Sequence, residues 1–272
     1  MTIILIIILI LLLTNPNIVS YEVINAAKLW LFILLPTIFP SFVFIDLLSA
    51  DKFINKLCER IYLILKPIFK INCPKSAYII LISLICGAPA STKLIKKNID
   101  NKEITQNEGF NIICSFSTLS LPYTIFICNK IGINPIFYYA LFLLLATIWM
   151  NIFNKKETPI IIESFVNESS FIDCFFESIK KNVEIALNIL CIIIIFRVMI
   201  SLTIKNNSFL YSFIEILGGH TQTNNKFIIL SSLGFLSFSL HFQMLSIDKT
   251  LNYLKFLLSR LFFCSLGFLC FL

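Results

Sequence analysis

Charged residues are scarce in this chain, and their scarcity excludes most soluble folds. Asp, Glu, Lys and Arg make up 14% of the 272 residues, whereas hydrophobic types make up 58%. A soluble domain with so little charge on its surface would aggregate. Apolar runs recur along the whole length, and about 20 such residues suffice to cross a bilayer core roughly 30 Å thick. The composition therefore predicts an all-α, polytopic integral membrane protein.

Motifs for catalysis and metal binding are also missing. No HExxH, GxSxG or Walker loop occurs, and no Cys/His cluster has the spacing of a zinc site. The nine cysteines include no CxxC pair, and their odd number argues against a disulfide framework. Ser239 and His241 would form a nucleophile with its base only in an extended stretch. We therefore expect no enzyme activity, no cofactor and no bound metal.

Positive charge exceeds negative charge, with a net charge of +7, but its distribution does not indicate a nucleic-acid partner. Lysine and arginine concentrate at residues 52–75, 93–102 and 180–181, beside apolar segments. Positive loops next to membrane spans usually lie in the cytoplasm. The pattern predicts a multi-pass protein of the cell membrane, with the lipid bilayer as its partner.

Composition divides the chain into four parts. Residues 1–25 contain an apolar run that reads as an uncleaved first span reaching Val19, with a removed signal peptide as the alternative. Residues 26–153, the first unit, and residues 183–272, the second unit, flank a polar linker at 154–182 that we place in the cytoplasm. The predicted spans of the two units are residues 29–48, 110–128, 135–153, 183–204, 227–245 and 253–272.

Several of these apolar segments are interrupted where they should lie at membrane depth. The interruptions fall at residues 86–91, 115–122, 215–219 and 237–243. Hydrocarbon cannot hydrogen-bond a freed peptide group, so broken backbone is tolerated only inside protein or beside a watery cavity. Both units follow the same order, and an odd number of crossings would turn the second upside down. We expect two inverted repeats, each with a re-entrant or broken helical hairpin, as in secondary transporters.

The interruptions supply the predicted substrate site. Its residues are Gly87, Pro89, Ser91, Ser117, Thr118, Ser120, Pro122, Glu215, Gly218, Ser239, His241 and Gln243. Glycine and proline let the chain reverse and direct amides and carbonyls at a ligand, while hydroxyl groups can bind a polar solute. Two alternatives stay open: a plain kink at Gly87 and Pro89, and contacts between helices for the hydroxyl groups.

Ionisable side chains within membrane segments cost about 2.5 to 3.5 kcal/mol each unless they are paired or hydrated. Asp46, Arg197 and Glu215 are such groups. Asp46 and Arg197 would pair with each other or reach an interface, whereas we expect Glu215 to hold a cation, a proton or a polar group of the substrate. His241 either contacts a nucleobase or sugar or serves only in packing, and we expect His220 in a loop.

Five short patterns, in order along the chain, resemble one family. They are Leu35-Pro36-Thr37-Ile38-Phe39-Pro40, Cys86-Gly87-Ala88-Pro89-Ala90-Ser91-Thr92-Lys93, Phe116-Ser117-Thr118-Leu119-Ser120-Leu121-Pro122, Glu215-Ile216-Leu217-Gly218-Gly219, and Ser239-Leu240-His241-Phe242-Gln243 with Arg260 downstream. The chain resembles, from residue 26 onward, sporulation integral membrane proteins of the YlbJ type. These proteins carry the nucleoside-recognition (Gate) domain that also occurs in nucleoside transporters and ferrous-iron permeases.

The resemblance implies a nucleoside-like solute, a coupling ion or proton, and a role in sporulation or envelope assembly. The chain departs from the family pattern at Cys86, Ala88, Ser91, Thr118 and the pair Leu236-Ser237, where the family has serine, tyrosine, glycine, asparagine and two glycines. These departures indicate a different ligand or a degenerate site. We predict a transporter-like solute permease. The alternative is a non-transporting structural or assembly factor with the same fold, and homo-oligomerisation stays open.

Overall fold

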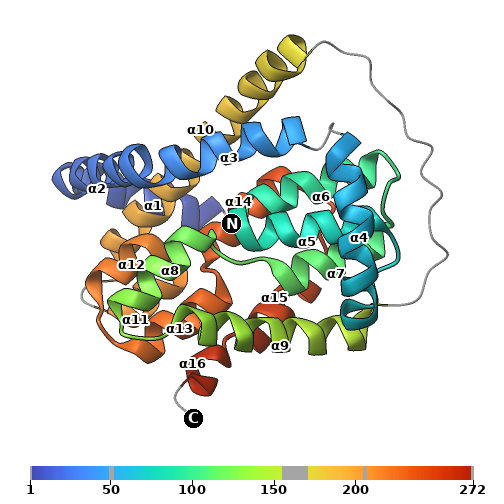
Figure 1. The fold of residues 1–272 in the computed structure, drawn as a ribbon. Coiled ribbons are helices and arrows are strands. Elements are labelled where there is room, and N and C mark those ends of the chain that lie inside the picture. Colours follow the sequence, from blue (N-terminus) through green and yellow to red (C-terminus); the bar gives the residue numbers. More distant parts are fainter. Residues whose placement is uncertain (1, 49–51, 155–170, 205–206, 271–272) are drawn as a thin grey trace.

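The computed structural model describes residues 2–48, 52–154, 171–204 and 207–270, and all regular structure within these ranges is helical (Figure 1). The helices of the first part are α1 (Thr2–Thr14), α2 (Pro16–Leu29), the π-helix η1 (Trp30–Leu34), α3 (Leu35–Leu48), α4 (Lys52–Phe69), α5 (Pro74–Cys86), α6 (Ala90–Asp100), α7 (Gln106–Phe116), α8 (Leu121–Lys130) and α9 (Pro135–Phe153). Those of the second part are α10 (Phe171–Thr203), α11 (Ser208–Ile214), α12 (Ile216–Gln222), α13 (Lys226–Phe235), α14 (Phe238–Ile247), α15 (Tyr253–Phe263) and α16 (Leu266–Leu269).

Five helical stretches among the described residues are long and apolar enough to cross a membrane. They are Pro16–Leu34, Gln106–Lys130, Pro135–Phe153, Ile172–Thr203 and Lys226–Ile247. The last four coincide with spans that the sequence predicts, two of them running through a short break in the helix. The prediction of an all-helical chain with several apolar spans is confirmed.

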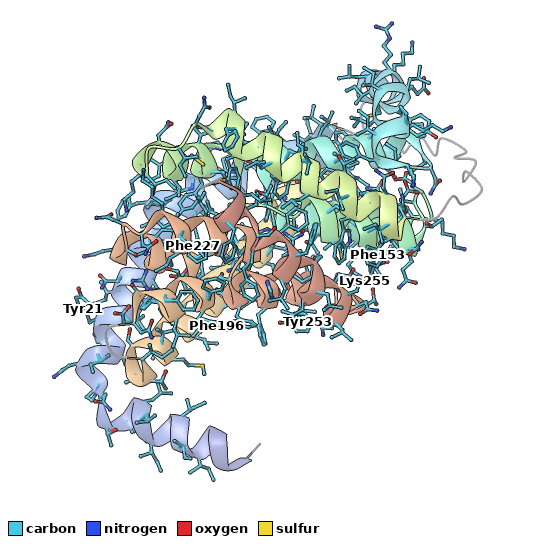
Figure 2. The ribbon with its side chains drawn as sticks, turned by 90° about the horizontal axis from the view of Figure 1, so that it is seen from below. Tyr21, Phe153, Phe196, Phe227, Tyr253 and Lys255 are labelled. Atoms are coloured by element: carbon cyan, nitrogen blue, oxygen red, sulfur yellow. The ribbon has the colours of Figure 1, made fainter. Side chains whose placement is uncertain are left out.

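The N-terminal span differs from the prediction. Helix α1 ends at Thr14, and Pro16 begins α2, so the first stretch that could cross runs from Pro16 to Leu34. The predicted span 29–48 is therefore wrong as a unit, because its first residues belong to this stretch and Phe39–Leu48 is a shorter apolar helix. Proline suits the first turn of a new helix because no amide is needed there. Figure 2 shows the N-terminal helix extending away from the rest of the chain.

The last predicted span, residues 253–272, is not one helix over the described residues. Helix α15 ends at Phe263, and the chain turns before the short helix α16. The amide of Ser265 donates to the carbonyl of Phe262 at 3.2 Å, closing the turn. The turn lays Gly267 against Ser231 of α13, where any larger residue would collide with the serine hydroxyl. Close packing between helices therefore ends this span early.

The predicted linker also differs at its boundary. Residues 155–170 lie outside the described ranges, but Phe171 already begins α10, a helix of 33 residues that runs without interruption past residue 182. The polar end of the linker and the following apolar span thus form one helix.

Helix α10 packs against α2 and α3 on one side of the fold (Figure 1). Polar contacts join these helices at two separate places. Arg197 of α10 pairs with Glu22 of α2 at 3.2 Å. Toward the other end, Asn182 of α10 donates to Asp46 of α3 at 3.1 Å, and Lys93 of α6 pairs with the same carboxylate at 2.5 Å. A pair between Asp46 and Arg197, one expectation from the sequence, is therefore wrong. The helices run antiparallel, so these residues lie at opposite ends.

The segment between α2 and α3 winds as a π-helix. The amide of Leu35 bonds to the carbonyl of Trp30, five residues back. Pro36 follows directly and has no amide to donate, so one hydrogen bond of the ordinary helical pattern is missing at this point. Single π-turns of this kind occur often at functional sites.

Four breaks interrupt helices in the middle of the fold, each within or next to a predicted interruption but shorter than it, since residues 216–219 are helical in α12 and residues 238–243 are helical in α14. They are residues 87–89 between α5 and α6, residues 117–120 between α7 and α8, Glu215 between α11 and α12, and residues 236–237 between α13 and α14. The helices Lys56–Phe69 and Pro74–Cys86 also meet at a bend of 83°.

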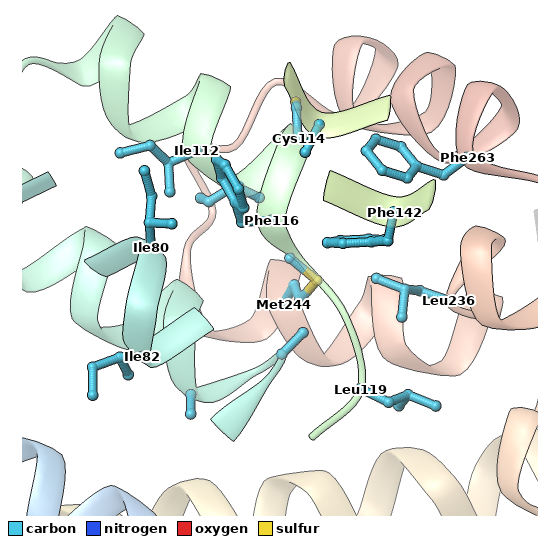
Figure 3. Packing of buried hydrophobic residues seen from close by; sticks show 14 of the residues in the cluster. Ile80, Ile82, Ile112, Cys114, Phe116, Leu119, Phe142, Leu236, Met244 and Phe263 are labelled. Atoms are coloured by element: carbon cyan, nitrogen blue, oxygen red, sulfur yellow. The ribbon is translucent and has the colours of Figure 1, made fainter. Parts of the chain in front are cut away.

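Buried apolar residues from both units meet in one cluster (Figure 3). Phe142 of α9 and Phe263 of α15 have ring centroids 5.1 Å apart. Phe116 at the end of α7 and Met244 near the start of the unwound chain that leads to Leu119 are both 0% exposed. The two units therefore share one core, and each break is enclosed by protein.

Substitution of Gly87 by alanine should strongly destabilise the protein. Gly87 has a φ of +71°, and an added Cβ would lie 2.6 Å from the carbonyl oxygen of Thr118. We expect the free energy of unfolding to fall by about 2 to 5 kcal/mol, from backbone strain plus overpacking. Gly132 is a matched control, with a φ of +68° and no contact closer than 3.8 Å. Gly132→Ala should cost only about 1 to 2 kcal/mol. Equal losses in detergent micelles would contradict the close approach at Gly87.

Candidate functional site

The four breaks line one pocket of about 330 Å³, which we name the central pocket. Its lining residues are Ile33, Leu34, Cys86, Ala88, Pro89, Leu119, Ser120, Pro122, Tyr123, Phe126, Glu215, Ile216, Ser237, Ser239, Leu240 and Gln243. The volume lies at the small end of the range for sites that bind small molecules. Segments that are far apart in sequence thus enclose a single space.

Two breaks of the first unit are bonded directly to each other. The amide of Ala88 donates to the carbonyl of Thr118 at 2.7 Å. The absence of a side chain at Gly87 allows this approach, because the backbone of residues 118–120 occupies the space of a Cβ. Two unwound segments therefore satisfy part of each other's backbone and present Pro89 and Ser120 to the central pocket.

The breaks of the second unit are closed by their own side chains. Glu215 is buried, and its carboxylate accepts a bond of 2.6 Å from the amide of Gly218, at the start of α12. Ser237 similarly accepts a bond of 3.5 Å from the amide of Leu240, at the start of α14. Acceptors of this kind satisfy amides that a helix start leaves without a partner.

Arg260 of α15 closes the broken end of α7. Its guanidinium is 0% exposed, donates to the carbonyl of Ser117 at 2.8 Å, and donates also to the carbonyl of Cys114. The rings of Phe256 and Phe263 flank the cation. No carboxylate pairs with it within the described ranges of the chain. The negative end of a helix dipole favours a cation, so the carbonyls of α7 take the place of a carboxylate.

His241 closes the broken end of α13. Its Nε2 lies 2.8 Å from the carbonyl of Phe235, the last residue of that helix. Because a carbonyl only accepts, Nε2 carries the proton, and Nδ1 accepts from the hydroxyl of Tyr253 at 3.3 Å. His241 is 0% exposed and does not line the central pocket. Its contacts are those of a helix cap.

His220 lies in α12, so the expectation of a loop position is wrong. The ring is buried, with Nε2 2.9 Å from the hydroxyl of Ser232, which itself donates to the carbonyl of Ile229. Nε2 is therefore the donor, and Nδ1 accepts from Tyr123 at 3.4 Å. Tyr123 lines the central pocket, so His220 contacts a wall residue on the side that faces away from the pocket.

Half of the predicted site residues line the central pocket, and the other half do not. Those that line the central pocket are Pro89, Ser120, Pro122, Glu215, Ser239 and Gln243. Those that do not are Gly87, Ser91, Ser117, Thr118, Gly218 and His241. Most of the second group hold the breaks in shape through backbone contacts or caps, as described above. Ser91 is buried in the first turn of α6, and its hydroxyl has no hydrogen-bond partner.

Sequence reasoning missed several residues of the central pocket. Ile33 and Leu34 come from the π-helix, and Tyr123 and Phe126 come from α8. Their only sequence signal is proximity to a proline. Ser237 carries a clearer signal, since it stands with Leu236 where the proteins that the sequence resembles have two glycines. Leu236 has a φ of 68° and Ser237 a φ of 42°, which is the region that glycine adopts most readily.

The pocket combines apolar walls with a few polar groups on one side. Glu215, Ser237, Ser239 and Gln243 come from the second unit, while most lining residues of the first unit are apolar. Among the described residues, no three His, Cys, Asp or Glu side chains are grouped in a way that could hold a metal ion. The arrangement can recognise an organic molecule by shape and by a small number of hydrogen bonds.

Comparisons with protein-family models, with curated proteins and with solved structures find no match for this chain.

Loss of the Arg260 cap should destabilise the fold. Arg260→Gln removes the donors of two buried carbonyls, which should lower the free energy of unfolding by about 2 to 4 kcal/mol. Arg60, exposed on α4, is the control, and Arg60→Gln should change it by no more than about 0.5 kcal/mol. Denaturant titration in detergent micelles measures both. Similar losses in the two variants would show that Arg260 is not an essential cap.

Proposed function

We propose that this chain is a solute permease whose substrate site is the central pocket. One observation carries the proposal: all four helix breaks line a single pocket. Broken backbone within a membrane is otherwise difficult to reconcile with stability, since each unpaired peptide group costs several kcal/mol in hydrocarbon. Convergence of such breaks on one pocket is the arrangement expected of a transporter that binds its substrate near the midplane.

The proposal includes two inverted repeats. The order of elements supports it: a long helix, a broken hairpin, an interrupted span and a further helix occur in each unit. In the first unit these are η1 with α3, α5 with α6, α7 with α8, and α9; in the second they are α10, α11 with α12, α13 with α14, and α15. Under this proposal the hairpins enter from opposite faces, and alternating access arises from movement of one unit against the other.

The solute in this proposal is small and partly polar, and a nucleoside is the first candidate through the family resemblance. Helices α6, α8 and α14 begin at the central pocket, so their first-turn amides lie near its wall. Glu215 is the candidate for coupling to an ion or proton. His241 was a second candidate, but its capping contacts favour a structural role. A role in sporulation or envelope assembly also follows only from the resemblance.

A non-transporting assembly factor is the alternative, and one feature favours it. The chain departs from the family pattern at Cys86 and Ala88, and both residues line the central pocket. A protein that no longer bound a solute would still need Arg260 and Gly87 for its fold. The residues that line the pocket could then change during evolution without loss of function.

Binding of radiolabelled nucleosides to the purified protein tests the proposal. Ser120 lines the central pocket, whereas Ser117 in the same unwound segment does not and has a hydroxyl without a partner. Ser120→Ala should weaken binding up to about tenfold through loss of one hydrogen bond, and Ser117→Ala should leave it unchanged. No saturable binding of any nucleoside, or equal effects of both changes, would count against a nucleoside site in this pocket.

Glu215→Gln separates recognition from coupling. Glutamine retains an oxygen that can accept from the amide of Gly218, so the fold should persist. We expect solute binding in detergent to survive while uptake into proteoliposomes loses its dependence on an ion or pH gradient. Unchanged gradient dependence would exclude Glu215 as the coupling group. Intact partner capture from membranes without any uptake by the native protein would favour the assembly factor.

A further inference from the structure

The central pocket reaches the surface beside apolar side chains. Two of its lining residues are largely exposed, Ile33 of η1 at 46% and Phe126 of α8 at 62%. The residues of its inner wall, such as Ile216, Ser239 and Leu240, are buried. The pocket is therefore open on the side where η1 and α8 form its rim.

The surface around this rim is apolar. Leu31 and Phe32 of η1 are 48% and 73% exposed, and Ile125 of α8 is exposed next to Phe126. Pro16–Leu34, which includes η1, and Gln106–Lys130, which includes α8, are both stretches long and apolar enough to cross a membrane. Exposed apolar side chains on such helices face lipid, because contact with water would be costly. The rim therefore lies against the bilayer interior.

The exposed rim and the buried wall of the pocket differ in polarity. The rim residues Ile33 and Phe126 are apolar, whereas the buried wall of the second unit carries the polar groups of Glu215, Ser239 and Gln243 beside apolar side chains. Among the described residues, no lysine or arginine lines the pocket. This contrast fits a molecule with an apolar body toward the rim and one uncharged or hydrogen-bonding end inside.

We propose that the central pocket takes an amphiphile that enters sideways from the bilayer, with its acyl or ring body passing between η1 and α8. The inference rests on the proposed function for the position of the site, and it names an amphiphile in place of the nucleoside as the molecule bound there. The lipid-facing rim favours a bilayer molecule over a water-borne solute. A second copy of the chain over the rim is the competing occupant, and the test below distinguishes it.

Photolabelling in nanodiscs tests this route. The protein is reconstituted in phosphatidylcholine nanodiscs that contain a monoacylglycerol probe, illuminated, and digested for mass spectrometry. One form of the probe carries a diazirine at the end of its acyl chain, and the other form carries it beside the glycerol ester. A carbene reacts only with atoms that it touches. We expect adducts at Phe126 and Phe32 on the surface from the first form, and adducts on residues 239–243 of the buried wall from the second form. Core residue Phe142, 1% exposed and not a lining residue, should remain unlabelled as the control.

A larger side chain in the pocket should remove the probe adducts on residues 239–243, which we name the inner labels, and leave the surface adducts in place. Ala88→Leu, or Ser120→Leu if the first variant does not fold, should reduce adducts on residues 239–243 at least tenfold while those at Phe32 persist. Labelling of Phe126 without labelling of the buried wall would overturn the inference. So would protein–protein crosslinks at Phe126 in place of lipid adducts.

The nucleoside assay distinguishes the two proposals. Nucleoside binding without inner labels would support the permease and contradict entry of an amphiphile from the bilayer. Inner labels without transport of any solute would support the amphiphile site and contradict the permease.

Discussion

Broken helices in an apolar environment leave peptide groups without partners, and the architecture of this chain depends on how those groups are satisfied. Three donors serve the broken ends. The guanidinium of Arg260 bonds the carbonyls of Cys114 and Ser117, the imidazole of His241 bonds that of Phe235, and the amide of Ala88 bonds that of Thr118. Without them, continuous helices would be more stable, and the four breaks could not enclose a pocket.

These bonds join parts of the chain that are distant in sequence. Arg260 belongs to the second unit and holds the unwound segment of the first, and Lys96 of α6 approaches Asp248 beyond α14 at 3.8 Å. Lys93 ties the same helix α6 to Asp46 and Asn182. If one unit moves relative to the other, these contacts must either break or move together with the residues that form them. The shape of the central pocket and the relative position of the units are therefore linked.

Part of the candidate site could be recognised from sequence. Glycine, proline and serine within apolar runs mark the breaks, because few other residues are tolerated there, and half of the residues chosen on this basis line the pocket. The functions of individual residues could not be assigned in the same way. His241 and Ser239 stand two positions apart, yet one caps a helix and the other lines the pocket. Which side of a helix faces the pocket depends on the packing of its neighbours.

Sequence alone determined the all-helical class, four of the five apolar spans and the positions of the breaks, because hydropathy and the exclusion of unpaired peptide groups act locally along the chain. Tertiary structure decided the partners of the charged groups. Asp46 meets Lys93 and Arg197 meets Glu22 because α10 lies antiparallel to α2 and α3, which no local pattern reveals. It also decided that the four breaks share one pocket, since that depends on long-range bonds such as that of Arg260 to Ser117.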